Sequence, residues 1–109
     1  MDVRGHLDLL LLATLARTGP AHGYAVIADL RSQSTGIFDL PEGTVYPALH
    51  RLETAGLVAS EWDNSGPRKR RLYTITADGH RARVSRQREW HGFAAAVASV
   101  LANPRTATS

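Results

Sequence analysis

The sequence of 109 residues contains no cysteine. This absence excludes disulfide bonds, thiolate metal sites and thiol nucleophiles, and it fits a protein of the cytoplasm. No apolar run approaches the ~20 residues that a membrane-spanning helix needs, so we expect no membrane partner. The leucine-rich segment 7–15 follows charged residues and lacks a cleavage-site pattern, so we expect no signal peptide.

Motifs of enzymes and of metal sites are also missing. The five histidines form no HExxH motif and no His-x-His cluster. The chain has no glycine-rich phosphate loop and no GxSxG elbow, and no set of nucleophile, base and orienting group is recognisable. We therefore predict that the protein is not an enzyme and holds neither a metal ion nor a cofactor.

Positive charge is concentrated in the second half of the chain. Residues 1–63 contain four arginines against eight acidic residues, a net charge of −4. Residues 64–109 contain nine basic residues against two acidic ones, a net charge of +7. This distribution indicates a polyanionic partner. The alternative is a basic helix whose charges are simply solvated.

Two helices are predicted at the start of the chain. The first spans residues 7–17 and is apolar around most of its circumference, so it should face the core on one side and a second subunit on the other. The second runs from about residue 21 to residue 32, and the residues expected to face inward are Tyr24, Ile27, Ala28 and Leu30. The short connection between the second helix and the next fits a helix-turn-helix arrangement.

A third helix is predicted immediately before Gly56, which stands where a helix stop is expected. Val45, Leu49 and Leu52 have the i, i+4, i+7 spacing of a buried face. Pro47 is expected in the first turn of this helix, where its missing N–H removes no helical hydrogen bond.

The opposite face of this third helix is polar and weakly charged. A helix of this kind can enter the major groove of DNA, where each base pair displays its own pattern of donors and acceptors. For Tyr46 the alternative is a half-buried packing role, and for Arg51 it is a solvated surface charge. The candidate DNA-contacting residues of this face are Thr44, Tyr46, Pro47, His50 and Arg51.

Two strands are predicted at residues 57–63 and 70–76, joined by a turn with a basic run. Such a hairpin should contact the sugar-phosphate backbone, which gives affinity and salt dependence rather than sequence choice. Alternation sends Arg70 and Arg71 to opposite sides, so not every basic residue can contact the same partner. The candidate DNA-contacting residues of the hairpin are Arg68, Lys69 and Arg70.

A long last helix is predicted at residues 77–102, capped by Thr76 and followed by a disordered tail at residues 103–109. Its first half is rich in arginine, which we interpret as mainly solvated, and its second half carries an apolar stripe. We predict that this stripe pairs with the first helix in a dimer seam. A tryptophan there would also suit a flat aromatic ligand. The predicted residues of the dimer and effector seam are Leu7, Leu11, Trp90, Phe93 and Val97.

Together these elements predict a mainly α fold with a small β-hairpin. The order is that of a winged helix-turn-helix, with three N-terminal helices, a two-stranded wing and a long C-terminal dimerisation helix. We expect residues 1–76 to form the DNA-binding domain and residues 77–102 to form the dimerisation helix.

Three sequence blocks resemble the PadR family of bacterial transcriptional regulators. They are Gly-Pro-Ala-His-Gly-Tyr at residues 19–24, Gly-Thr-Val-Tyr-Pro-Ala-Leu-His-Arg-Leu-Glu at residues 43–53 and Leu-Tyr-Thr-Ile-Thr at residues 72–76. The resemblance implies a dimeric winged helix, usually a repressor, in which each C-terminal helix pairs with its mate's N-terminal helix. The single C-terminal helix resembles the short subfamily, some members of which bind flat hydrophobic drugs beside a tryptophan comparable to Trp90.

The combined expectation is a homodimeric repressor that binds a pseudo-palindromic operator in double-stranded DNA and is released by a flat hydrophobic or aromatic small molecule. By resemblance, Thr44, Tyr46 and Pro47 would meet the operator, while Arg68 and Lys69 would lie on the wing. The alternative is a winged helix whose third helix binds a protein, because the polar face carries little net charge.

Overall fold

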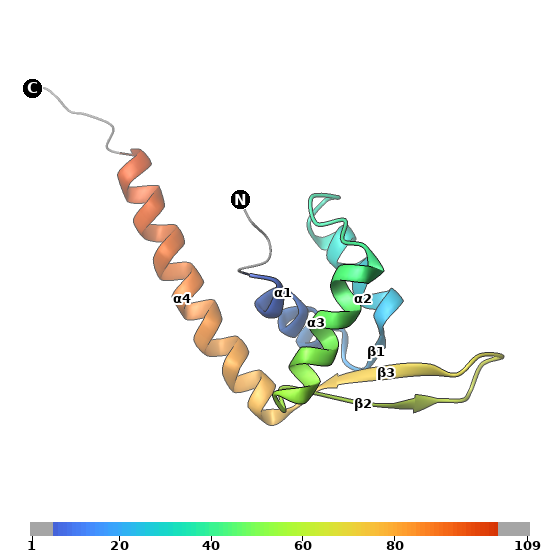
Figure 1. Ribbon diagram of the computed structural model, residues 1–109. Coiled ribbons are helices and arrows are strands. Elements are labelled where there is room, and N and C mark those ends of the chain that lie inside the picture. Colours follow the sequence, from blue (N-terminus) through green and yellow to red (C-terminus); the bar gives the residue numbers. More distant parts are fainter. Residues whose placement is uncertain (1–5, 103–109) are drawn as a thin grey trace, which may run out of the picture.

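The computed structural model describes residues 6–102, which form four α-helices and a three-stranded sheet (Figure 1). In chain order the elements are α1 (Leu7–Thr18), β1 (Ala21–His22), α2 (Gly23–Gln33), α3 (Glu42–Thr54), β2 (Val58–Asp63), β3 (Arg70–Ile75) and α4 (Ala77–Ala102). The predicted winged helix-turn-helix is confirmed, with α2 and α3 as the helix pair and β2 and β3 as the wing. The predicted tail at 103–109 lies outside the described residues.

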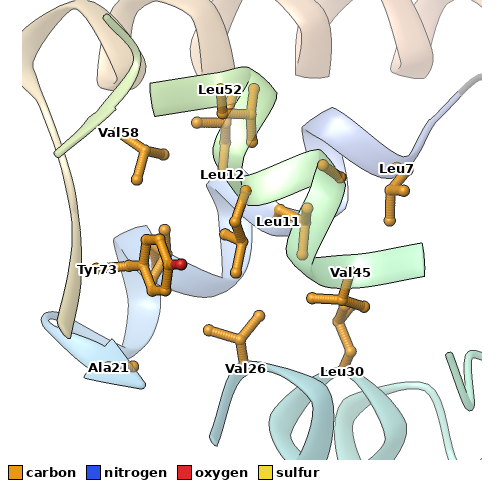
Figure 2. Close-up of a cluster of buried hydrophobic side chains, with 13 residues drawn as sticks. Leu7, Leu11, Leu12, Ala21, Val26, Leu30, Val45, Leu52, Val58 and Tyr73 are labelled. Atoms are coloured by element: carbon orange, nitrogen blue, oxygen red, sulfur yellow. The ribbon is translucent and has the colours of Figure 1, made fainter. Parts of the chain in front are cut away.

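The first three helices and the base of the sheet enclose one hydrophobic core (Figure 2). The predicted stripe on α3 is confirmed, because Val45, Leu49 and Leu52 are at most 2% exposed. Each such buried side chain stabilises the fold by about 1.5–3 kcal/mol. The stripe therefore fixes the rotation of α3 and leaves its opposite face towards solvent. The fully buried side chains of α1 and α3 include Leu11, Leu12, Leu15, Val45, Ala48 and Leu49.

A third strand, which the sequence pattern did not reveal, completes the sheet. The strand order is β1-β3-β2, and both pairings are antiparallel. β1 consists of Ala21 and His22 alone, which is too short for alternation to be visible in a sequence. The predicted hairpin is confirmed, since residues 58–63 pair with residues 70–75 along their whole length.

The inward face of α2 differs from the prediction. Tyr46 of α3 closely covers Gly23, so this side of α2 is turned inward. Val26 and Leu30 continue the same side and are buried, whereas Tyr24 points away and is 69% exposed. The expectation that Tyr24 faces inward is therefore wrong. Of the other residues expected to face inward, Leu30 is buried as predicted, and Ile27 and Ala28 are half-buried.

The C-terminal end of α3 agrees with the prediction, but its N-terminal end does not. The helix starts directly after Pro41, whose backbone is extended and whose carbonyl accepts the Thr44 N–H at 3.0 Å. Pro47 is thus the sixth helical residue and not, as predicted, part of the first turn. Because proline has no N–H, the carbonyl of Gly43 lacks its usual i+4 partner. Gly56, with φ of +78°, forms the predicted stop.

The first turn of α4 is locked against the body of the protein. The Gly79 N–H donates to Thr76 Oγ1 at 3.0 Å, which confirms the predicted cap, and Thr76 Oγ1 donates to the Gly56 carbonyl at 2.7 Å. Gly79 is buried. A Cβ there would overlap the Leu57 carbonyl oxygen and lie 2.7 Å from Ile75 Cγ1. No larger residue fits this contact without displacing the backbone.

The second half of α4 leaves the body of the protein (Figure 1). This projection explains a radius of gyration of 17.0 Å, compared with about 13 Å expected for a compact domain of this length. Among residues 6–102 no helix is both long and apolar enough to cross a membrane. The exposed large apolar side chains of the projecting half are Phe93, Val97, Val100 and Leu101.

Candidate nucleic-acid interface

The outer face of α3 lies opposite its buried stripe. Pro47 and His50 are exposed at the centre of this face, and Thr54 continues it one turn further on. Thr44 and Tyr46 are half-buried at its two edges. The structure therefore keeps the predicted residues on one helix but withdraws two of them partly from solvent.

Tyr46 combines packing with partial exposure. A Cβ on Gly23 would lie 2.5 Å from Tyr46 Cε1, so the phenol ring tightly covers the start of α2. The same ring packs against the hydrophobic core. The packing role considered from the sequence is thus present, and it fixes the angle between the two helices of the helix-turn-helix.

Arg51 reaches from α3 towards α1. Its Nη2 donates to Asp8 Oδ1 at 2.9 Å, and Arg86 of α4 approaches the other oxygen, Asp8 Oδ2, at 3.7 Å. The Arg51 side chain is 59% exposed, so solvent screens the pair with Asp8. Exposed ion pairs contribute about 0–1 kcal/mol, so a phosphate or a base edge can replace Asp8 at small cost.

The tip of the wing is the connection between β2 and β3, residues 64–69. Arg68 and Lys69 are exposed there, and neither forms an ion pair within residues 6–102. Arg70 is exposed as well and pairs in register with Asp63, on the face of the sheet that is turned away from α3. The tip therefore presents two uncompensated positive charges, with a third on the back of the hairpin.

Asp63 ties the wing tip to β1. Its Oδ1 accepts the Ser65 N–H at 3.0 Å, and its Oδ2 lies 2.8 Å from His22 Nε2. The hydrogen bonds from Ser65, followed by that from His22, lower the pKa of Asp63 from 3.8 to about 2. The carboxylate is therefore ionised at neutral pH, where it holds the turn that presents the basic residues.

Sequence reasoning missed two residues on the α3 side of the wing. Trp62 and Arg71 face each other across β2 and β3, and Arg71 Cζ lies 4.8 Å from the centre of the Trp62 ring. Alternation separated Arg70 from Arg71 but could not tell which of them faces α3. The two residues border a hollow of about 460 Å³ between α3 and the wing. Its lining is His50, Glu53, Thr54, Trp62, Arg71 and Tyr73.

The phenol of Tyr73 is the most buried part of this lining, with the residue only 6% exposed. Burial, followed by the nearby Glu53 carboxylate, raises the pKa of Tyr73, and Arg71 opposes this shift. The phenol therefore stays neutral at physiological pH and adds no charge to the hollow.

A second hollow, of about 410 Å³, lies between the start of α1 and α4. Trp90 meets His6 edge to face with 5.0 Å between ring centroids, and Phe93 lies 6.1 Å from Trp90 on the same side of α4. Phe93 is 60% exposed and Val97 is 40% exposed. The lining of this hollow is His6, Asp8, Leu9, Arg86, Glu89, Trp90 and Phe93.

Burial corrects the α1 residues predicted for the dimer seam. Leu7 is 4% exposed and Leu11 is 0% exposed, because both point into the core of the chain itself. A helix with leucine on most sides gives no sign of which side lies deeper. Leu9, which is half-buried and borders the second hollow, is an α1 leucine that a partner could reach beside α4.

The arrangement defines a class of protein. A helix-turn-helix whose second helix is exposed beside a basic two-stranded wing is the architecture of winged-helix DNA-binding proteins. Across the described part of the chain, no group of three or more His, Asp or Glu residues is placed to hold a metal ion. The exposed polar side chains of α3 and the basic wing tip offer recognition by hydrogen bonds and charge.

Comparison with known proteins gives the family. The transcriptional regulator PadR-like family matches residues 11–85. A PadR family transcriptional regulator from Eggerthella lenta is 37% identical, with a TM-score of 0.79 over 90% of this chain and 83% of that chain. A transcriptional regulator from Clostridium thermocellum is 26% identical, with a TM-score of 0.82 over 89% of this chain and 94% of that chain. An uncharacterized protein of Lysinibacillus sphaericus is 28% identical over 89 residues, 81% of either chain.

The chain belongs to the PadR-like family of transcriptional regulators. It is accordingly a DNA-binding regulator of transcription, and the family is not one of enzymes. The resemblance carried by the three sequence blocks is thereby confirmed.

Proposed function

We propose that the protein is a cytoplasmic homodimeric repressor that binds a pseudo-palindromic operator and is released by a flat hydrophobic or aromatic effector. The observation that carries this proposal is the exposed outer face of α3 beside a wing tip with two uncompensated positive charges. In this view residues 1–76 bind DNA and residues 77–102 hold the two copies together.

On the operator, α3 enters the major groove and turns Pro47, His50 and Thr54 towards the base edges. Arg51 exchanges Asp8 for a base edge or a phosphate. Arg68 and Lys69 reach the flanking backbone from the wing tip. Two half-sites then lie about one helical turn, roughly 34–36 Å, apart.

The dimer forms through the apolar stripe of α4. Phe93, Val97, Val100 and Leu101 are exposed on the half of α4 that projects from the body, and a second copy of the chain offers the same surface in return. Burying such side chains in the interface stabilises the dimer by about 25 cal/mol for each Å² of apolar surface removed from water. A two-fold axis at this stripe also supplies the symmetry that a pseudo-palindromic site requires.

The effector site is the hollow beside Trp90. Its indole is half-buried between His6 and Phe93 and presents aromatic surface to a flat ligand. A ligand there releases the operator only if it binds the non-binding arrangement of the dimer more tightly. That arrangement would change the spacing of the two α3 helices.

Fluorescence anisotropy with labelled duplexes tests the proposal. One duplex carries the region upstream of the protein's own gene, and the other is a scrambled duplex of the same composition. At physiological salt we expect affinity for the upstream duplex to exceed that for the scrambled one by about 10³-fold or more. Equal affinity for both at every salt concentration would favour the alternative, a winged helix that binds a protein through the weakly charged face of α3.

Replacing Arg51 with alanine should show whether this side chain contacts base edges or only the DNA backbone. We expect affinity for the operator to fall about tenfold, since a well-placed base contact discriminates by about 1–3 kcal/mol, and affinity for the scrambled duplex to change little. The matched control is Arg31→Ala, which removes an exposed arginine of α2 that pairs with Asp39 of the loop before α3. An equal loss on both duplexes would show that Arg51 does not read bases.

Replacing Arg68 and Lys69 together with alanine should reduce the salt dependence of binding. The slope of log K against log salt should flatten by about 0.9 for each phosphate that a subunit no longer neutralises. The control is the double variant of Arg81 and Arg88, which removes the same charge from exposed positions on α4. A slope unchanged in the wing variant, or equally changed in the control, would mean that the wing tip does not contact DNA.

A further inference from the structure

The hollow between α3 and the wing is built around one aromatic ring. Trp62 is 56% exposed, although tryptophan is a large apolar residue whose burial would stabilise the fold. It lies on the side of β2 that faces α3, two residues after Ser60 and four after the buried Val58. The ring is therefore presented to the hollow by the strand and is not a loose surface side chain.

Arg71 holds this ring in place. Its guanidinium lies 4.8 Å from the Trp62 ring centre and donates to Ser60 Oγ from Nε at 3.1 Å and from Nη2 at 2.5 Å. Nη2 also lies 3.5 Å from Glu53 Oε2 of α3, and Ser60 Oγ donates to the same carboxylate oxygen at 2.7 Å. This network connects α3 to the wing and fixes the direction of the indole before any partner arrives.

The charges in the hollow cancel. Glu53 and Arg71 neutralise each other, and the Tyr73 phenol is neutral, so the hollow does not attract a phosphate by net charge. The uncompensated positive charges lie further out, at Arg68 and Lys69 of the wing tip. An apolar ring in a locally neutral hollow, bordered by a basic tip, suits a ligand that alternates neutral and anionic groups.

The path of a DNA strand supplies such a ligand. If α3 occupies the major groove and the wing tip reaches the neighbouring minor groove, the strand that separates these grooves must pass between them. The wing leaves the C-terminal end of α3 (Figure 1). The hollow is lined by both elements, so it lies on this passage. A DNA strand alternates neutral deoxyribose with anionic phosphate.

We propose that the hollow receives one sugar-phosphate strand of the operator, with a deoxyribose packed on the exposed face of Trp62. This inference rests on the proposed binding of DNA by α3 and the wing. It assigns Trp62 an apolar, sequence-independent share of the affinity, distinct from the ionic share of the wing tip and from base reading by α3.

The first test compares Trp62→Ala and Trp62→Phe by anisotropy over a range of salt concentrations. Tryptophan is enriched among the interface side chains whose truncation costs most affinity, so we expect Trp62→Ala to lower affinity about tenfold on both the upstream and the scrambled duplex. The slope of log K against log salt should not change, because no charge is removed. Trp62→Phe should recover most of the affinity.

The second test measures the solvent accessibility of Trp62 itself in the wild-type protein. Acrylamide quenching of tryptophan emission should fall when the wild-type protein is saturated with duplex DNA. The Trp62→Phe protein, in which Trp90 alone emits, should show no such protection. Equal protection in both proteins, or none in the wild type at saturation, would overturn the proposal for Trp62 while leaving DNA binding intact. Absence of any anisotropy change would instead overturn DNA binding itself.

Discussion

Replacing Phe93 and Val97 together with glutamate is expected to convert the protein to monomers and to lower its affinity for the operator by about 10²–10⁴-fold. The loss is expected because a dimer binds the operator through two linked α3 helices. Once one of them is bound, the linkage raises the effective concentration of the other, and this increases affinity by such a factor without any change in the contacts of each helix. Both side chains are exposed on the projecting half of α4, so the folded chain should tolerate the charge. Sedimentation velocity and anisotropy on the same samples measure the two effects.

The matched control is Ala95→Glu with Ala98→Glu. These residues lie on the same helix but away from the apolar stripe, at helical positions roughly opposite Phe93. This variant adds the same charge and should remain a dimer with nearly wild-type affinity. A dimer that survives the glutamates at Phe93 and Val97 would place the subunit interface elsewhere.

Replacing Gly79 with alanine is expected to destabilise the protein by about 2–3 kcal/mol, the upper range for overpacking. The new Cβ would overlap the Leu57 carbonyl oxygen, which is backbone and cannot rotate away, and would press on Ile75 Cγ1. Urea unfolding followed by far-UV circular dichroism, at one fixed protein concentration, measures the free energy of unfolding.

Gly92 offers the control on the same helix. A Cβ at this position meets nothing within 4 Å, and alanine is favoured over glycine inside a helix by about 0.8–1.0 kcal/mol. Gly92→Ala should therefore be neutral or stabilising. If Gly79→Ala were equally harmless, the close contact between α4 and the wing would have to open at little cost, and the lock on α4 would not exist.

Periodic signals in the sequence predicted most of the fold. The spacing of Val45, Leu49 and Leu52 placed the buried side of α3 correctly, and Thr76 marked the start of α4. The errors fall where periodicity is weak. The two residues of β1 are too few to alternate, and α1 carries leucine on so many sides that the pattern could not separate Leu7 and Leu11, which are core, from half-buried Leu9.

The exposure of several candidate residues was predictable from the sequence, but the contacts of others were not. His50, Arg68 and Lys69 are exposed where the sequence placed them. The partner of Arg51 is separated from it by 43 positions, so no local pattern could reveal the pair with Asp8. Arg71 looked equivalent to its neighbour in the basic run, because only the register of the sheet decides which of two adjacent side chains faces α3.

The carboxylate of Asp8 can couple the binding of a ligand beside Trp90 to the binding of the operator by α3. One of its oxygens accepts a hydrogen bond from Arg51 of α3, and the other faces Arg86. The same side chain borders the hollow beside Trp90. A cation that bound Asp8 from the hollow would compete with both arginines. By linkage, whatever factor such a ligand imposed on operator affinity, the operator would impose on the ligand in return.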